Sequence, residues 1–209
     1  MKDYRNTPYK DNIHLQNICE KKRELLSEIK KTNPNKKNLY DLFSNKENIY
    51  NNKFMNIYDF KCCYCGVSIK IIDKYLFEID HFIPKTSKLF NTAKYKAGNI
   101  NNLILSCRSC NRRKAKFEFK SKRKPFHPDK NINIFFKRDK DYSIIIEDKY
   151  RKNKHINEFY NKLKLNFQIH RLDYLIMCMK DFCKETKNKK IELYLNKIIS
   201  TLLERRNLH

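Results

Sequence analysis

The chain has 209 residues, 40% of them hydrophobic, which is enough to bury a core for one compact unit with extensions. Its formal net charge of +24 would attract a polyanion from a distance, and nucleic acid is the polyanion that this charge favours. Because Lys, Asn and Ile are abundant and Gly occurs only twice, as an AT-rich genome alone would produce, the charge by itself is weak support for nucleic-acid binding.

Two classes of protein are excluded by the apolar pattern. A membrane span needs about 18 consecutive apolar residues, which the chain lacks, and its first residues are too polar for a secretory signal. We therefore expect a cytoplasmic protein. The eight cysteines are unevenly spread, and four of them form two tight pairs, which favours metal binding over a disulfide framework.

The first part of the chain is predicted to be helical. Apolar residues at helical spacing indicate a helix over residues 11–31, which Asn33-Pro34-Asn35 ends. A second helical stretch over residues 38–58 leads directly into the first cysteine pair. We expect residues 1–60 to form a helical extension that braces the segment after it.

The two cysteine pairs predict a structural zinc site. Cys62 with Cys65, and Cys107 with Cys110, have the Cys-x-x-Cys spacing at which two thiolates of one tight turn reach the same tetrahedral zinc. Gly66 follows the first pair, where such a turn commonly needs a residue that tolerates positive φ. Buried free thiols are the alternative, but matched pairs favour zinc.

The segment between the pairs is longer than the roughly 15–20 residues of an ordinary zinc ribbon, so it must contain structure of its own. Residues 75–81 alternate like a strand that ends in Asp80 and His81. Residues 99–105 suit a returning strand that enters the second pair, and residues 111–117 suit a helix. The predicted order is strand, strand, helix.

The remaining chain predicts a hairpin and further helices. Short β-rich runs at residues 132–136 and 142–146 flank a charged turn, which indicates a β-hairpin. Helical spacing over residues 154–206 predicts two C-terminal helices, whose apolar stripes could pack on the zinc segment or on a partner protein. No linker marks a boundary, and we divide the chain into the extension, a module at 61–120 and a C-terminal region at 121–209.

The string Cys-x-x-Cys, Asp-His, Asn-Leu, Cys-x-x-Cys-Asn-x-x-Lys resembles the zinc-stabilised HNH family of ββα-metal nucleases, over about a quarter of the chain. The resemblance implies an α+β fold with a zinc-stabilised ββα-metal core, flanking helices and an additional β-hairpin. It implies that His81 is the general base and that Asn102 orients the loop bearing it. It also implies that Asp80 and Asn111 bind a catalytic magnesium or manganese ion, for which oxygen ligands are suited.

The residue types also suit phosphodiester hydrolysis on chemical grounds. A negatively charged phosphodiester repels hydroxide, so its hydrolysis needs a base for water and a cation for the developing charge. His81 can be that base, because an imidazole with its ordinary pKa of about 6.5 is largely neutral in the cytoplasm. Four basic residues near these groups are expected to contact backbone phosphates without reading the bases: Lys85, Arg112, Arg113 and Lys114.

Each candidate also has a simpler interpretation. The Asp80-His81 dipeptide alone would more often lie on a surface, while Asn102 could end a strand and Asn111 could cap a helix. Their positions between and beside the cysteine pairs favour the catalytic roles. His127, in a His-Pro-Asp sequence, is more typical of a turn than of a site.

A wider similarity includes the aromatic-rich approach to Cys62, the Asp-His-Phe-x-Pro-Lys run, Asn-Leu-x-Leu-Ser-Cys and the helical C-terminal half. In these features the chain resembles the HNH component of Septu-type anti-phage systems, which implies a role in defence beside an ATPase of the ABC/RecF kind. We therefore expect a metal-dependent endonuclease, with DNA the expected substrate and RNA the alternative. Two competing hypotheses are a non-catalytic zinc module that binds nucleic acid or a partner, and a toxin-like subunit that is silent until an ATPase presents its substrate.

Overall fold

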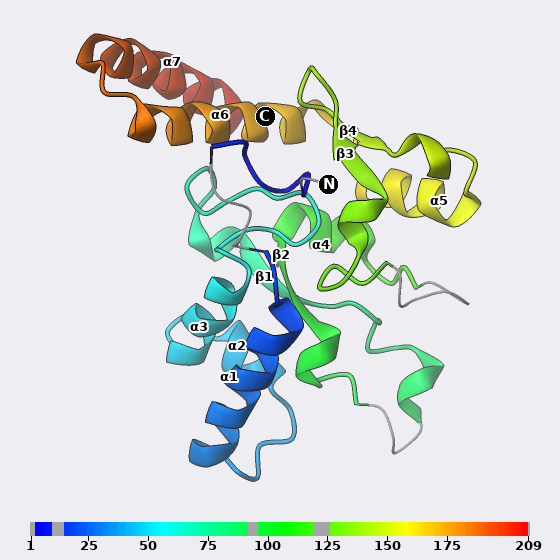
Figure 1. The fold of residues 1–209 in the computed structure, drawn as a ribbon. Helices are drawn as coiled ribbons and strands as arrows, with labels where there is room; N and C mark the ends of the chain where they lie inside the picture. The colour runs from blue at the N-terminus through cyan, green and yellow to red at the C-terminus, as the bar shows by residue number, and fades with distance from the viewer. Residues whose placement is uncertain (1–2, 10–14, 92–95, 119–125, 209) are drawn as a thin grey trace.

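The computed structural model describes residues 3–9, 15–91, 96–118 and 126–208, in which helices surround two short antiparallel sheets (Figure 1). The central sheet pairs β1 (Phe77–His81) with β2 (Leu103–Cys107). The second sheet pairs β3 (Phe136–Arg138) with β4 (Ile144–Ile146). The fold is therefore of mixed helix and sheet, as expected.

Three helices lie in the described part of the N-terminal extension: α1 (Ile18–Thr32), α2 (Tyr40–Ser44) and α3 (Ile49–Ile57). The prediction of one helix over residues 38–58 was wrong, because the chain leaves the helical path after Ser44. Asn48 then starts a new helix, its side chain accepting a hydrogen bond from the N–H of Tyr50 at 2.9 Å. Residues 11–14 of the first expected helix lie outside the described residues.

The central module follows the predicted order of strand, strand and helix, and this arrangement is consistent with a ββα-metal core. Both strands begin later than expected, since 3₁₀ turns occupy Lys74–Leu76 and Ile100–Asn102. Helix α4 (Arg108–Lys114) begins within the second cysteine pair and ends at Ala115, whose φ is 49°. It therefore has the predicted length of seven residues but begins three residues earlier, within the cysteine pair.

The C-terminal region differs more from expectation. The run at residues 132–136 forms a 3₁₀ turn over Ile132–Ile134, and the hairpin strands have only three residues each. Three helices follow instead of two: α5 (Lys154–Leu163), α6 (Gln168–Glu185) and α7 (Lys189–Asn207). Helix α5 ends at Lys164, which takes a left-handed conformation with φ of 52°, and no Gly or Pro announces that break.

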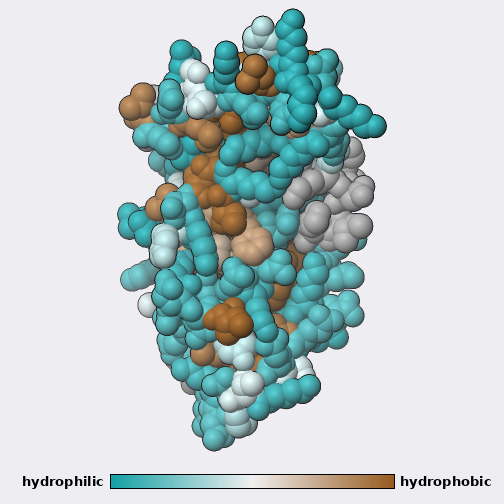
Figure 2. All heavy atoms as spheres, turned by 90° about the vertical axis from the view of Figure 1, so that its left-hand side faces the viewer, coloured by the Kyte–Doolittle hydropathy of each residue, from teal (hydrophilic) through white to brown (hydrophobic). Residues whose placement is uncertain are grey.

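Helices α6 and α7 lie antiparallel across one end of the molecule (Figure 1). Helix α6 buries Tyr174, Ile176 and Met177, whereas α7 buries one apolar side chain fully, that of Ile199. Exposed apolar residues remain on the outer side of α7: Ile191, Leu193, Tyr194 and Ile198. Figure 2 shows one face of the molecule, on which apolar residues form a broken band from the upper part to the middle among hydrophilic side chains. No helix in the described part of the chain is sufficiently long and apolar to cross a membrane.

A buried lysine joins the N-terminal helices to the module and to the C-terminal region. The ammonium of Lys22, which is 0% exposed, donates to the carboxylate of Asp129 and, at 2.6 Å, to the carbonyl of Leu103 at the start of β2. Asp129 also accepts from the hydroxyl of Tyr58 at 2.7 Å. Lys22 lowers the pKa of Asp129 against the opposing effect of burial, so the carboxylate stays charged in the core.

Replacing Lys22 should therefore destabilise the whole molecule. The Lys22→Met variant would leave the Asp129 carboxylate buried without its cation, and we expect it to lose about 3–5 kcal/mol of unfolding free energy. The measurement is urea unfolding followed by circular dichroism, with the exposed Lys30→Met of the same helix as the matched control. Adding Asp129→Asn to Lys22→Met should recover part of the loss. Equal stability of Lys22→Met and Lys30→Met would contradict the role assigned to Lys22.

Candidate metal centre and active site

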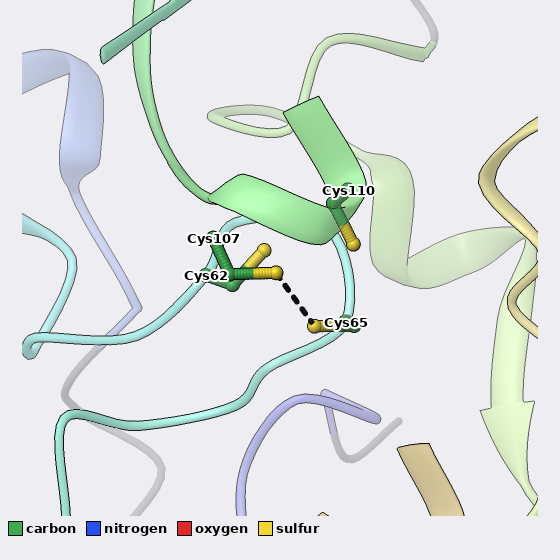
Figure 3. A group of neighbouring side chains, drawn as sticks. All are labelled: Cys62, Cys65, Cys107 and Cys110. Carbon is green, nitrogen blue, oxygen red and sulfur yellow. Dashed lines mark hydrogen bonds between the residues drawn. The ribbon is translucent and has the colours of Figure 1, made fainter. Parts of the chain in front are cut away.

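Four cysteines form a compact cluster (Figure 3). The sulfurs of Cys62, Cys65, Cys107 and Cys110 lie within 4.8 Å of one another, and none of these residues is more than 3% exposed. The Cys65 and Cys107 sulfurs are 3.9 Å apart. Sulfurs of a tetrahedral zinc site with Zn–S bonds of about 2.3 Å would be separated by about 3.8 Å. The cluster therefore fits zinc in both ligand type and spacing.

Local backbone geometry brings the two pairs together. The N–H of Gly66 donates to the carbonyl of Cys62 at 2.9 Å, which closes the first turn, and Gly66 has the positive φ expected there, 81°. A Cβ at this position would lie 2.8 Å from the Cα of Arg5, so the glycine is also required by close approach of the N-terminal segment. The second pair spans the junction of β2 and α4.

Side chains from distant segments hold the first turn. Its three consecutive carbonyls each accept one hydrogen bond: Cys63 from Arg5 at 2.9 Å, Tyr64 from the hydroxyl of Tyr4, and Cys65 from Arg138 at 3.1 Å. Arg5 and Tyr4 are each 2% exposed. The turn is thus fixed from outside as well as by its cysteines.

A row of polar groups lies between β1 and α4. Alternation along β1 places Glu78 and Asp80 on the strand face toward α4, while Asn111 and Lys114 are three residues apart on the helix. Asn111 Nδ2 donates to Glu78 Oε2 at 2.7 Å, and Lys114 Nζ donates to Asp80 Oδ1 at 2.9 Å. The two expected metal ligands, Asp80 and Asn111, thus line the same interface but bond to different partners.

Asp80 lies deep in this interface. It is 5% exposed, and its second oxygen accepts from the hydroxyl of Tyr64 at 2.7 Å. Burial raises the pKa of its carboxyl, although the adjacent Lys114 ammonium favours the ionised form. Carboxylate and carboxamide oxygens are hard donors, so the chemistry of this row suits magnesium or manganese rather than zinc.

His81 lies at the end of β1 against the opposite side of the strand. Its ring packs on that of Tyr40 from α2, with centroids 4.8 Å apart and an interplanar angle of 30°. Its buried Nε2 has no hydrogen-bond partner among the described residues. Burial, together with the nearby cations of Lys85 and Lys114, lowers the pKa of His81 to about 4. The imidazole is therefore neutral at neutral pH.

Asn102 fixes the loop that follows His81. Its Oδ1 accepts from the N–H of Ile83 at 2.8 Å, and its Nδ2 donates to the carbonyls of Ile83 and Ala97 at 3.1 and 3.0 Å. The N–H of Phe82 donates to the Asn102 carbonyl at 2.8 Å. Both residues after His81 are thus tied to Asn102, which sets where β1 ends.

The four basic residues expected at phosphates differ in how exposed they are. Lys85 and Arg112 are exposed, and the Lys85 ammonium lies 4.3 Å from the ring centre of Tyr40. Arg113 is half-buried over the ring of Phe167. Lys114 differs from expectation, because it is 1% exposed and donates to Asp80 and to the His81 carbonyl. It lies inside the polar row and is not available at the surface.

Sequence reasoning missed three residues of the site. Glu78 was indicated by alternation with Asp80, since residues two apart share a strand face. Tyr64 lies between the cysteines of the first pair, and only the turn geometry brings its hydroxyl to Asp80. Tyr40 is about forty residues away from His81 in sequence, and no local pattern pointed to it.

Comparison with known proteins agrees with the geometry. The family model of the HNH endonuclease matches residues 62–117, which identifies this segment as an HNH endonuclease domain. The matched segment contains all four clustered cysteines and both strands of the central sheet. No curated protein and no solved structure matches the chain. An HNH domain implies a nuclease in general, and its cysteine cluster implies metal binding.

Metal analysis should find zinc bound to the four cysteines. The Cys107→Ser variant should lose the metal and unfold at a temperature at least several degrees lower, because zinc binding supplies folding free energy. The measurements are elemental analysis of the purified chain and thermal unfolding. The half-buried Cys183→Ser on α6 is the control. Full zinc content in Cys107→Ser would contradict the assignment.

Proposed function

We propose that this chain is a metal-dependent endonuclease that hydrolyses phosphodiester bonds of nucleic acid, with His81 as the general base. The observation that carries the proposal is the state of that histidine. It is neutral, its buried Nε2 lacks a partner among the described residues, and Asn102 fixes the loop beside it. A buried nitrogen without a partner is costly, and substrate or its attacking water would satisfy it.

The residues around His81 prepare it to accept a proton. Packing against the Tyr40 ring restricts the imidazole, and the low pKa prevents protonation before substrate arrives. When Nε2 takes a proton from water, the hydroxide formed is directed at a phosphate beside the strand end. Lys85, exposed next to the Tyr40 ring, would hold an oxygen of that phosphate.

The polar row supplies the second requirement. Asp80 and Asn111 would hold magnesium or manganese, and such an ion would absorb negative charge on the phosphate and the leaving oxygen. Lys114 neutralises Asp80, so a cation held by Asp80 would compete with the Lys114 ammonium for Oδ1. Glu78 holds the amide nitrogen of Asn111 and thereby turns the carbonyl oxygen of Asn111 away from Glu78. This orientation of the Asn111 amide supports its proposed role as an oxygen ligand.

The biological setting that we propose is anti-phage defence, with DNA as substrate and RNA as the alternative, beside an ATPase of the ABC/RecF kind. Its support is the resemblance to Septu-type components in the residues around Asp80 and in the helical C-terminal half. Cleavage by the purified chain alone would show that the ATPase is dispensable for chemistry. Cleavage only when the ATPase is added would favour the toxin-like arrangement.

A non-catalytic zinc module is the second candidate, and the buried Asp80–Lys114 pair is the observation in its favour. A carboxylate paired at 2.9 Å with a lysine that is 1% exposed can be purely structural. This candidate predicts nucleic-acid binding without magnesium-dependent or manganese-dependent cleavage. It also predicts that replacing His81 does not change the affinity for nucleic acid.

Replacing His81 tests the proposal directly. We expect His81→Ala to reduce metal-dependent cleavage of plasmid DNA or labelled RNA by at least about 100-fold, because general-base catalysis contributes that much. The assay is a cleavage time course with the ATPase present and absent. Zinc content and thermal stability should match the wild type. His155→Ala, at an exposed position of α5, is the control, and undiminished cleavage by His81→Ala would refute the assignment.

Tyr40 is expected to act as a positioning residue. Tyr40→Ala should lower kcat by about ten-fold with little change in KM, because without the ring the base leaves its productive orientation. Tyr40→Phe keeps the ring and should retain most of kcat. Steady-state kinetics checks this, with the exposed Tyr75→Ala as the control. A rise in KM with kcat unchanged would instead assign Tyr40 to substrate binding.

A further inference from the structure

A cavity lies beside the four-cysteine cluster, between α4 and the facing ends of α6 and α7. Its volume is about 570 Å³, within the range of about 300–1,000 Å³ typical of small-ligand sites. The module contributes one wall and the C-terminal helices the other. Four arginines line it: Arg108, Arg112 and Arg113 from α4, and Arg206 from the end of α7.

Two of the four arginines are neutralised and two are not. Arg108 pairs with Glu78 at 2.9 Å, and Arg206 pairs with Asp173 at 2.6 Å. Among the residues that the structure describes, no carboxylate pairs with Arg112 or Arg113. The cavity therefore has positive charge in excess, which favours an anionic ligand.

The partners of Arg113 hold it in place without neutralising it. Its Nη1 lies 3.5 Å from Nε2 of His170, and since a guanidinium can only donate, this imidazole nitrogen must accept and be neutral. The guanidinium also lies 4.7 Å from the ring centre of Phe167. His170 is 3% exposed, and its Nδ1 has no partner in the described chain. A buried histidine thus fixes a charged group at the cavity wall.

The remaining wall is apolar, which a simple anion would not require. Phe167 and Leu76 are 40% and 37% exposed, and Ile72 and Ile169 line the cavity beside them. A ligand that satisfies both kinds of wall combines an anionic group with a planar apolar face. A nucleotide has this combination, its phosphate suiting arginine and its base suiting aromatic and aliphatic side chains.

The cavity also adjoins the polar row of the candidate active site. Glu78 binds Arg108 Nε at 2.9 Å and Asn111 Nδ2 at 2.7 Å, so a single carboxylate joins the cavity rim to an expected metal ligand. Arg112 follows Asn111 directly on α4 and lines the cavity. The cavity and the polar row thus share Glu78 and helix α4.

We propose that this cavity binds one unpaired nucleotide of the substrate, next to the phosphate that is cleaved. The proposal rests on the proposed nuclease function and refines its substrate class. A base can enter a cavity only when it is unstacked, so single-stranded segments or readily opened sites are favoured over stable duplex. The arginines hold the phosphate, and the apolar wall covers the base.

Binding is tested separately from cleavage by using full-length His81→Ala as the parent. The probe is a fluorescent single-stranded oligodeoxynucleotide, and fluorescence anisotropy gives its Kd at several salt concentrations. We expect Arg112→Gln with Arg113→Gln to weaken binding about ten-fold or more. The plot of the logarithm of the binding constant against the logarithm of salt concentration should also become shallower. Its slope should fall by about 0.7 for each phosphate that is no longer neutralised. Exposed Arg205→Gln on α7 is the control.

The base-binding wall is tested by Phe167→Ala and by probes with one abasic site moved along the strand. Phe167→Ala should weaken binding of the intact strand about ten-fold. It should have little effect on the probe whose abasic site falls at the cavity. Arg112→Gln alone, at an exposed position, keeps the test valid if another variant fails to fold. Equal weakening with every abasic probe, or unchanged binding by the arginine variants, would overturn the proposal whether or not the wild type cleaves.

Discussion

The convergence of four thiols on one point determines where the rest of the module can lie. Helix α4 has only seven residues, too few to be stable alone in water. Two of the four cysteines lie at its start, so the cluster fixes this helix against β2 and the first turn. Asn111 and Lys114 reach β1 only because their helix is held there. The spacing of the candidate active site therefore depends on the metal centre beside it.

The four cysteines are not the only groups that hold the first cysteine turn in place. Arg138 donates to the carbonyls of Tyr4, Tyr142, Cys65 and His170, and so connects the N-terminal segment, the second hairpin, the metal centre and α6. Burial lowers the pKa of Arg138, and its four accepting carbonyls replace the water that the cation loses. A lysine, with its single ammonium, could not reproduce this planar set of donors.

Features with a local cause could be predicted from the sequence, and features with a distant cause could not. The Cys-x-x-Cys pairs, the positive φ of Gly66 and the strand before Asp80 each follow from a few neighbouring residues. The breaks after Ser44 and at Lys164 lack the Gly or Pro that usually announces them. The position of Lys114 depends on the depth at which α4 packs, and the packing of Tyr40 on His81 depends on the whole N-terminal extension.

The packing of Tyr40 on His81 has a consequence for how such a domain can be inherited. The segment recognisable by family, residues 62–117, carries the cysteines, His81 and the polar row, but the ring that restrains His81 comes from α2. Lys22, which secures the start of β2, also lies outside it. The smallest segment that could carry the whole site into another protein is therefore longer than the segment that the family model matches. Recombination at the edges of the conspicuous motif would transfer its reactive groups without the side chains that hold them.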